Sequence, residues 1–275
     1  MVPQVKNLWY GGSVSDDGQK LDPVYLYEVT SVAVQGLLYP FGVKDPDLEA
    51  MGPGRARPVI LIHGWGANRS CLYPLRWYLR SKGFDRIFGC NFVSAPSIEE
   101  LAEQLRDFVE QIRKCCDSGR QTVDLVAHSL GGLAARIYLQ ELGGAKHVDR
   151  CITIATPHYG TYSSYWTPMA LGRQMRPESE FMARLNDPKK RAPGVRFTSF
   201  WADLDLMVLP RENAIYKEGE DIPIHGIGHA GILLHHKTLR QVSERLRTGQ
   251  DIPATGLERV ALLAKGIFAK LRRSE

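Results

Sequence analysis

Short runs of consecutive apolar residues alternate along this chain with longer segments whose apolar residues recur at helical spacing. The clearest run is Val-Ile-Leu-Ile at 59–62, and further candidate strands lie at 86–91, 122–127, 149–155, 195–202 and 222–224. Candidate helices lie at 71–80, from 98 onward, at 130–142 and at 230–246. Because strands that alternate with amphipathic helices form a parallel sheet covered on both faces, we expect an α/β fold with a mostly parallel central sheet.

The chain has 275 residues, which fits one α/β domain with a short segment on either side, since such domains routinely reach about 250 residues. We place the domain at 56–250 and interpret 1–55 as an N-terminal extension whose residues 32–39 could add an edge strand. The alternation stops at about 157–193, where several aromatic side chains gather. This stretch is either an insertion packed over the sheet or a cap at the carboxyl ends of the strands, where open α/β sheets hold their ligands.

The charge of the chain does not indicate a nucleic-acid partner. The net charge is +5, but the basic residues form no stripe interleaved with aromatic ones, and no recognised binding motif accompanies them. The densest basic cluster lies in 251–275, which also carries apolar residues at helical spacing. We interpret this segment as a basic amphipathic helix that either docks on its own domain or makes peripheral contact with anionic lipid surfaces.

The cysteines bear on the cellular compartment of the protein. There are five of them, an odd number that includes an adjacent pair, and this pattern is not that of a disulfide framework. No apolar run approaches the length of a membrane span, and the first residues lack the pattern of a signal peptide. These features favour a cytoplasmic protein, although a secreted protein trimmed of its leader would look the same. The sequence does not indicate an oligomeric state.

The strongest local motif is Val-Ala-His-Ser-Leu-Gly-Gly at 126–132, which places Ser129 between a buried strand and the start of a helix. A sharp strand-to-helix turn at this point pushes the hydroxyl out of the sheet and requires small neighbours, because the turn crowds the backbone. Ala127 stands where the usual pattern has glycine. A serine between small residues is often structural, but the position after an apolar strand predicts a nucleophile.

A second motif, His-Gly-Trp-Gly at 63–66, follows the first strand. Glycines there let backbone N–H groups approach a reacting carbonyl, and an oxyanion hole usually also uses the N–H that follows the nucleophile. We therefore expect the N–H groups of Trp65 and Leu130 to be the oxyanion donors. A plain strand-terminating turn is the alternative interpretation.

A serine nucleophile needs a base, and eight histidines compete for that role. His229 follows the last strand in a glycine-containing loop that can hold an imidazole over the sheet. The alternative is a zinc site formed by histidines of this region: His225, His229, His235 and His236. Glycines interrupt the spacing and no cysteine pair accompanies it, so we expect His229 to be the base, with no metal and no other cofactor.

The carboxylate that orients the base is expected just after the strand at 195–202, where both Asp203 and Asp205 stand. The two are two residues apart, so an extended backbone would point them the same way and the pattern alone does not choose between them. With either, the chain order of nucleophile, acid and base is that of α/β-hydrolases and differs from the order in other serine hydrolases.

Together these motifs resemble the small bacterial lipases and esterases of the α/β-hydrolase family, in which the elbow often reads Ala-x-Ser-x-Gly. The matching segments are 59–66, 127–132, 155–161, 205–210 and 224–234, so the resemblance covers about 57–247. It implies the α/β-hydrolase fold with an insertion over the active site. It also implies the triad Ser129, Asp205 and His229, because the family's acid typically precedes an apolar residue pair and a valine.

The resemblance further implies a carboxylester or triacylglycerol substrate, cleaved through an acyl-enzyme. We expect short- to medium-chain acyl groups to bind against side chains near the two motifs and in the insertion: Trp65, His63, His128, Tyr162, Trp166 and Met169. The same triad could serve a thioesterase, an amidase or an acyltransferase, since the fold leaves the acyl acceptor open. A catalytically silent binding protein is the remaining alternative, but it has no physical need for all three triad residues.

Overall fold

The structure, a computed structural model, describes residues 23–43, 56–93, 95–117, 122–250 and 252. Within them six strands form one parallel sheet in the order β2-β1-β3-β4-β5-β6. The strands are β1 (Val59–Ile62), β2 (Ile87–Cys90), β3 (Val123–His128), β4 (Val148–Ile154), β5 (Arg196–Ala202) and β6 (Glu220–Ile224). The predicted parallel sheet is therefore confirmed.

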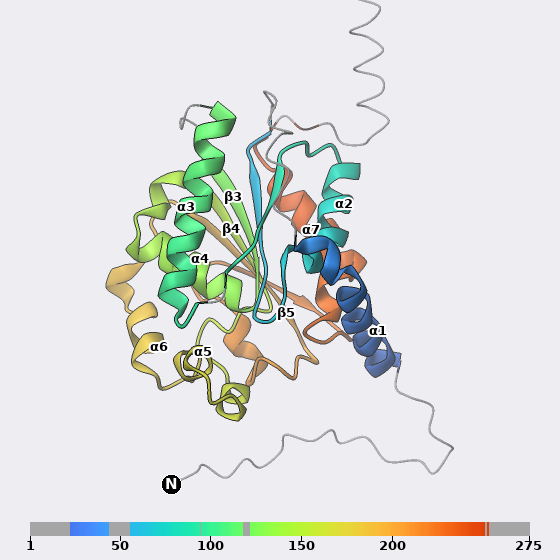
Figure 1. Cartoon of the computed structure of the whole chain (residues 1–275), viewed down its shortest axis with the longest axis vertical. Coiled ribbons are helices and arrows are strands. Elements are labelled where there is room, and N and C mark those ends of the chain that lie inside the picture. Colours follow the sequence, from blue (N-terminus) through green and yellow to red (C-terminus); the bar gives the residue numbers. More distant parts are fainter. Residues whose placement is uncertain (1–22, 44–55, 94, 118–121, 251, 253–275) are drawn as a thin grey trace, which may run out of the picture.

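Burial on both faces explains why the inner strands are continuous apolar runs. Every residue of β1 and β3 is buried. The side chains of one face of the sheet pack with α3 (Ile98–Asp117) and α4 (Leu130–Glu141), and those of the other face pack with α2 (Tyr73–Ser81) and α7 (His236–Arg247). Figure 1 shows the two pairs of helices on opposite sides of the sheet.

The parallel register brings the strand ends to one edge of the sheet. Ile62, the last residue of β1, pairs with Cys90 of β2 and Ala127 of β3, and His128 pairs with Ile154 of β4. The segments that follow β1, β3, β5 and β6 therefore meet at this edge, and they carry the predicted functional residues.

The insertion follows β4 and contains η5 (Tyr162–Trp166), α5 (Ala170–Gln174), α6 (Glu180–Leu185) and η6 (Pro188–Lys190). In Figure 1, α5 and α6 lie at the end of the molecule where the strands finish. The buried Arg136 of α4 ties this insertion to the domain, because its guanidinium donates to the carbonyls of His158 and Leu185 and to Asn186 Oδ1 at 2.8–2.9 Å.

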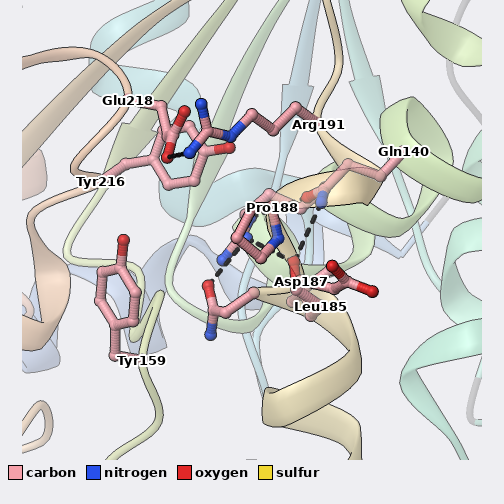
Figure 2. A pocket seen from close by; sticks show the side chains of 10 residues that line it. Gln140, Tyr159, Leu185, Asp187, Pro188, Arg191, Tyr216 and Glu218 are labelled. Atoms are coloured by element: carbon pink, nitrogen blue, oxygen red, sulfur yellow. Dashed lines mark hydrogen bonds and ion pairs between the residues drawn. The ribbon is translucent and has the colours of Figure 1, made fainter.

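A small polar cavity of about 20 Å³ lies beside this anchor (Figure 2). Gln140 Nε2 donates to the Leu185 carbonyl at 2.9 Å, and Arg191 pairs with Glu218 at 2.8 Å. The volume suffices for about one water molecule, so this cavity is too small for an acyl substrate.

Residues 23–42 form α1 (Pro23–Leu38) and the 3-10 turn η1 (Tyr39–Gly42). The prediction of a possible edge strand at 32–39 is therefore wrong. A short apolar run does not distinguish a strand from a helix by periodicity alone. The helix packs against η3 (Arg69–Leu72) and η8 (Gly231–Leu233) rather than extending the sheet, and this tertiary packing decides its conformation.

The helix expected at 230–246 is divided in two, because His235 has an extended backbone between η8 and α7. The remaining 3-10 turns are η4 (Gly144–His147) and η7 (Arg211–Ala214). The amphipathic helix predicted at 251–275 lies outside the described residues, apart from the buried Ile252. Among the helices that the structure does describe, none combines the length and apolar character needed to cross a membrane.

Candidate active site

Ser129 lies in the turn between β3 and α4 with φ 52° and ψ −124°. L-residues rarely adopt a positive φ, so this turn is strained, as a nucleophile elbow is. A Cβ placed on Gly64 would lie 3.0 Å from the Ser129 Cβ, and one on Gly131 would collide with the carbonyl of His63. Crowding around the serine therefore requires glycine at positions 64 and 131, one in each sequence motif.

The side chains of Ser129, His229 and Asp205 form a continuous hydrogen-bonded chain. His229 Nε2 lies 3.1 Å from Ser129 Oγ, and His229 Nδ1 lies 2.8 Å from Asp205 Oδ2. The other carboxylate oxygen, Asp205 Oδ1, accepts from the backbone N–H groups of Met207 and Val208 at 2.7 and 2.9 Å. These backbone donors fix the orientation of the carboxylate, which in turn fixes the imidazole.

Asp203, the rival carboxylate, points elsewhere. Its Oδ2 lies 3.0 Å from Nδ1 of the exposed His225, and its Oδ1 accepts from the Gly226 N–H at 2.8 Å. The backbone turns after β5, since Asp205 N–H donates back to the Ala202 carbonyl at 3.3 Å. The two aspartates therefore do not share a direction, which an extended backbone would have given them.

The environment favours a base that is held by an ionised acid. Burial lowers the pKa of His229, but the Asp205 carboxylate, its hydrogen bond and the charge of Glu28 together raise that pKa above its ordinary value. Burial raises the pKa of Asp205, but the charge and hydrogen bond of His229 and the two backbone N–H groups bring it below its ordinary value. An imidazolium that forms at His229 is therefore stabilised.

Trp65 and Leu130 both line the cavity beside Ser129. Leu130 is the first residue of α4, where helix geometry leaves the backbone N–H without an intrahelical acceptor. The close approach of Gly64 to Ser129 brings the loop of Trp65 alongside the serine. Both residues thus lie at the cavity beside the serine, and their N–H groups remain the candidate oxyanion donors.

A cavity of about 390 Å³ adjoins Ser129 and His229, within the range of about 300–1,000 Å³ typical of small-molecule sites. Its apolar lining includes Trp65, Leu130, Met175, Met207 and Val208. Three insertion hydroxyls that line it are already engaged: Thr161 and Ser163 donate to the Met207 carbonyl, and Ser164 donates to the Thr161 carbonyl. The cavity therefore presents a mainly apolar wall.

The residues predicted to bind substrate divide into two groups. His128 lines the cavity, and its Nε2 lies 3.3 Å from the His229 carbonyl. His63 is turned away, because its Nε2 accepts from the Phe92 N–H at 3.0 Å and its Nδ1 donates to the Gly64 carbonyl at 2.8 Å.

Tyr162, Trp166 and Met169 do not line the cavity, contrary to expectation, and are 52%, 89% and 58% exposed. The short turn η5 directs the first two outward, and Met169 precedes α5 on the outer side of the insertion. The pattern of aromatic residues did not reveal which side of each turn faces the serine.

Two polar residues at the site were missed because they lie in the presumed N-terminal extension. Gln35 of α1 lines the cavity and donates from Nε2 to the Ala230 carbonyl at 3.2 Å. Glu28 accepts from the Ala230 N–H at 2.6 Å and the Gly231 N–H at 2.9 Å. The sequence offered one indication of a special role for Glu28, because it is the only charged residue among the sixteen of α1.

The histidines considered for zinc do not converge. His225 pairs with Asp203, whereas His229 pairs with Asp205. His235 and His236 contact each other through their rings, at 5.0 Å between centroids. No group of three or more metal-ligating side chains occurs within the described part of the chain.

Residues 58–183 match the family model of palmitoyl protein thioesterase. Among solved structures, the mature lipase of Bacillus licheniformis is similar with a TM-score of 0.61 and 15% identity, over 71% of this chain and 94% of that one. Lipase B of Aspergillus fumigatus has the same TM-score with 19% identity, over 74% of this chain and 55% of that one.

A gene product of Listeria innocua aligns with a TM-score of 0.52 and 16% identity, over 72% of this chain and 97% of that one. The six-stranded parallel sheet and these likenesses show that the chain has the α/β-hydrolase fold. The predicted resemblance to bacterial lipases and esterases is confirmed.

Proposed function

We propose that this chain is a serine carboxylester hydrolase that cleaves short- to medium-chain acyl esters through an acyl-enzyme intermediate. The observation that carries the proposal is the hydrogen-bonded chain from Ser129 through His229 to Asp205 beside a mainly apolar cavity. The similarity to lipases and to a thioesterase family model supports hydrolysis of an acyl group.

In the first half of the reaction, Ser129 Oγ attacks the acyl carbonyl carbon while its proton passes to His229 Nε2. The carbonyl oxygen becomes an oxyanion, which the N–H groups of Trp65 and Leu130 stabilise. The C–O bond to the leaving group then breaks, and His229 Nε2 returns the proton to the departing alkoxide. Asp205 holds the imidazolium throughout but keeps its own charge.

In the second half, a water molecule attacks the acyl carbon of the Ser129 ester, and His229 takes a proton from that water. The same donors stabilise the second oxyanion. The bond to Ser129 Oγ breaks, the serine recovers its proton from His229, and the carboxylic acid leaves. The ester and one water molecule are the only reactants, so these steps need no metal or cofactor.

A thioesterase is the second candidate, because the matching family model is that of a palmitoyl protein thioesterase. The acyl half of the reaction is the same, and only the leaving group changes from an alkoxide to a thiolate. The mainly apolar lining suits either substrate, since it contacts the acyl chain.

Matched ester and thioester substrates with the same acyl group, from acetyl to octanoyl, test these assignments. We expect hydrolysis by the wild-type protein, a higher kcat/KM for esters, and loss on the order of 10⁶-fold in kcat for Ser129→Ala, by analogy with other serine hydrolases. Preference for the thioester would favour the second candidate. A Ser129→Ala protein that retains a tenth of the wild-type rate would refute both.

A further inference from the structure

Helix α1 contacts the His229 loop through the carboxylate of Glu28 and the amide of Gln35. Glu28 Oε1 accepts from the Ala230 N–H at 2.6 Å, and Glu28 Oε2 accepts from the Gly231 N–H at 2.9 Å. These are the two backbone groups directly after His229, so both oxygens of Glu28 clamp the backbone that carries the imidazole. Charge-assisted hydrogen bonds of this kind are roughly twice as strong as neutral ones.

The loop is shaped to receive this carboxylate. A Cβ on Gly228 would lie 2.6 Å from Glu28 Cδ, and one on Gly231 would lie 2.8 Å from Glu28 Oε2. Neither glycine has a positive φ, so backbone conformation does not require glycine at these positions. The space that they leave is filled by the side chain of Glu28.

The far end of the same segment is held to the domain independently of Glu28. Asn68 Nδ2 donates to the Tyr39 carbonyl at 2.9 Å, and Tyr73 OH donates to the Phe41 carbonyl at 2.8 Å. In the helix itself, Gln35 Nε2 donates to the Ala230 carbonyl at 3.2 Å. The segment therefore has several anchors besides Glu28, and the loss of one carboxylate leaves the others in place.

From this geometry we infer that Glu28 is a positioning residue, which holds the His229 loop so that the imidazole faces Ser129. The inference rests on the proposed function for its catalytic consequence. The ionisable groups around His229 are Asp205 after β5, His128 at the end of β3 and Glu28 on α1. The Glu28 charge also contributes to the raised pKa of His229, after burial, which opposes it, and Asp205.

Direct titration of the His229 imidazole by NMR tests this without relying on turnover. We expect Glu28→Gln, which keeps the shape but removes the charge, to lower the His229 pKa, because a negative charge that stabilises the imidazolium is lost. The matched control is Thr30→Ala on the exposed side of α1, which should leave that pKa unchanged. A His229 pKa equal in wild type and Glu28→Gln would overturn the inference.

Kinetics on the same proteins give the second readout. With esters, we expect Glu28→Gln to lower kcat by about 10- to 100-fold with little change in KM, because a displaced imidazole affects the chemical step. Equal kcat values in Glu28→Gln and wild type would overturn the inference, whereas a wild-type protein without hydrolytic activity would contradict the proposed function and leave the NMR result to decide the role of Glu28.

Gly228→Ala provides a variant in which Glu28 itself is intact. Its methyl group should displace the carboxylate and lower the His229 pKa as Glu28→Gln does, but it should have little further effect in a Glu28→Ala background. Additive effects of Gly228→Ala and Glu28→Ala would mean that the glycine acts independently of Glu28, against the inference.

Discussion

At the level of single residues, the turn of the backbone directly after β5 decides which aspartate is the catalytic acid. The sequence placed Asp203 and Asp205 on one side of an extended strand, and only the resemblance to known lipases favoured Asp205. In the structure the chain bends after Ala202, so Asp205 reaches His229 and Asp203 reaches His225. Local sequence could not predict this bend, because it depends on contacts that residues far along the chain supply.

We predict that Asp205→Asn lowers kcat by on the order of 10³- to 10⁴-fold, because an amide stabilises the wrong tautomer of the imidazole. The matched control is Asp203→Asn, which removes a carboxylate from the exposed pair with His225 and should change kcat by less than about tenfold. Steady-state kinetics on the two variants decide the matter. If Asp203→Asn instead caused the large loss of kcat, the assignment of Asp205 as the acid would be wrong. The assignments of Ser129 and His229 would not be affected.

The acid side of the pH profile follows from the state of His229. The imidazole acts as a base only when neutral, so activity falls as the pH drops through its pKa, which lies above the ordinary value of about 6.5. Burial lowers the pKa of His128 to about 3. This neighbouring imidazole therefore stays neutral and adds no second ionisation to the pH profile. We predict that kcat/KM falls with a single ionisation whose midpoint is above 6.5, and a midpoint below 6 would contradict the interpretation.

At the level of elements, the sequence predicted the sheet more accurately than the segments around it. Buried strands such as β1 and β3 are unmistakable because both faces demand apolar side chains. The possible edge strand predicted at 32–39 lies mostly in the second half of helix α1, which is apolar on most sides and mainly exposed. The insertion has no regular period, so the sequence identified its position but not which side chains face the cavity.

Two side chains distinguish the acyl-binding wall seen in the structure from the one predicted from the sequence. Met207, although 56% exposed, belongs to the cavity lining, whereas Trp166 is 89% exposed and does not. Each buried methylene contributes about 0.8 kcal/mol, or about fourfold in kcat/KM. We predict that Met207→Ala lowers the octanoyl-to-acetyl ratio of kcat/KM by about 4- to 15-fold, the loss of one or two such contacts.

Trp166→Ala is the control, and it should leave the same ratio unchanged. If Trp166→Ala lowered the octanoyl-to-acetyl ratio of kcat/KM and Met207→Ala did not, the acyl wall predicted from the sequence would be correct.

At the level of the whole molecule, Arg136 joins the insertion to the domain. Its guanidinium is buried, satisfies two carbonyls and one amide oxygen of the insertion, and lies 4.7 Å from the centroid of the Tyr216 ring. Burial lowers the pKa of Arg136, but arginine remains charged at every pH at which the protein folds.

We predict that Arg136→Met lowers the free energy of unfolding by about 3–5 kcal/mol, because it removes the three charge-assisted hydrogen bonds that the buried guanidinium donates to the insertion. Arg191→Met, which breaks an exposed ion pair with Glu218, should cost less than about 1 kcal/mol. Denaturant unfolding monitored by tryptophan fluorescence compares the two. Equal losses would mean that the insertion is held by other contacts.

Covalent labelling tests directly whether Ser129 is the nucleophile. A fluorophosphonate reacts with an activated serine and leaves an adduct that mass spectrometry assigns to one residue. We predict a single adduct on Ser129 in the wild-type protein, none in Ser129→Ala, and much slower labelling in His229→Ala. An unlabelled wild-type protein, or an adduct on any other residue, would show that Ser129 is not the nucleophile.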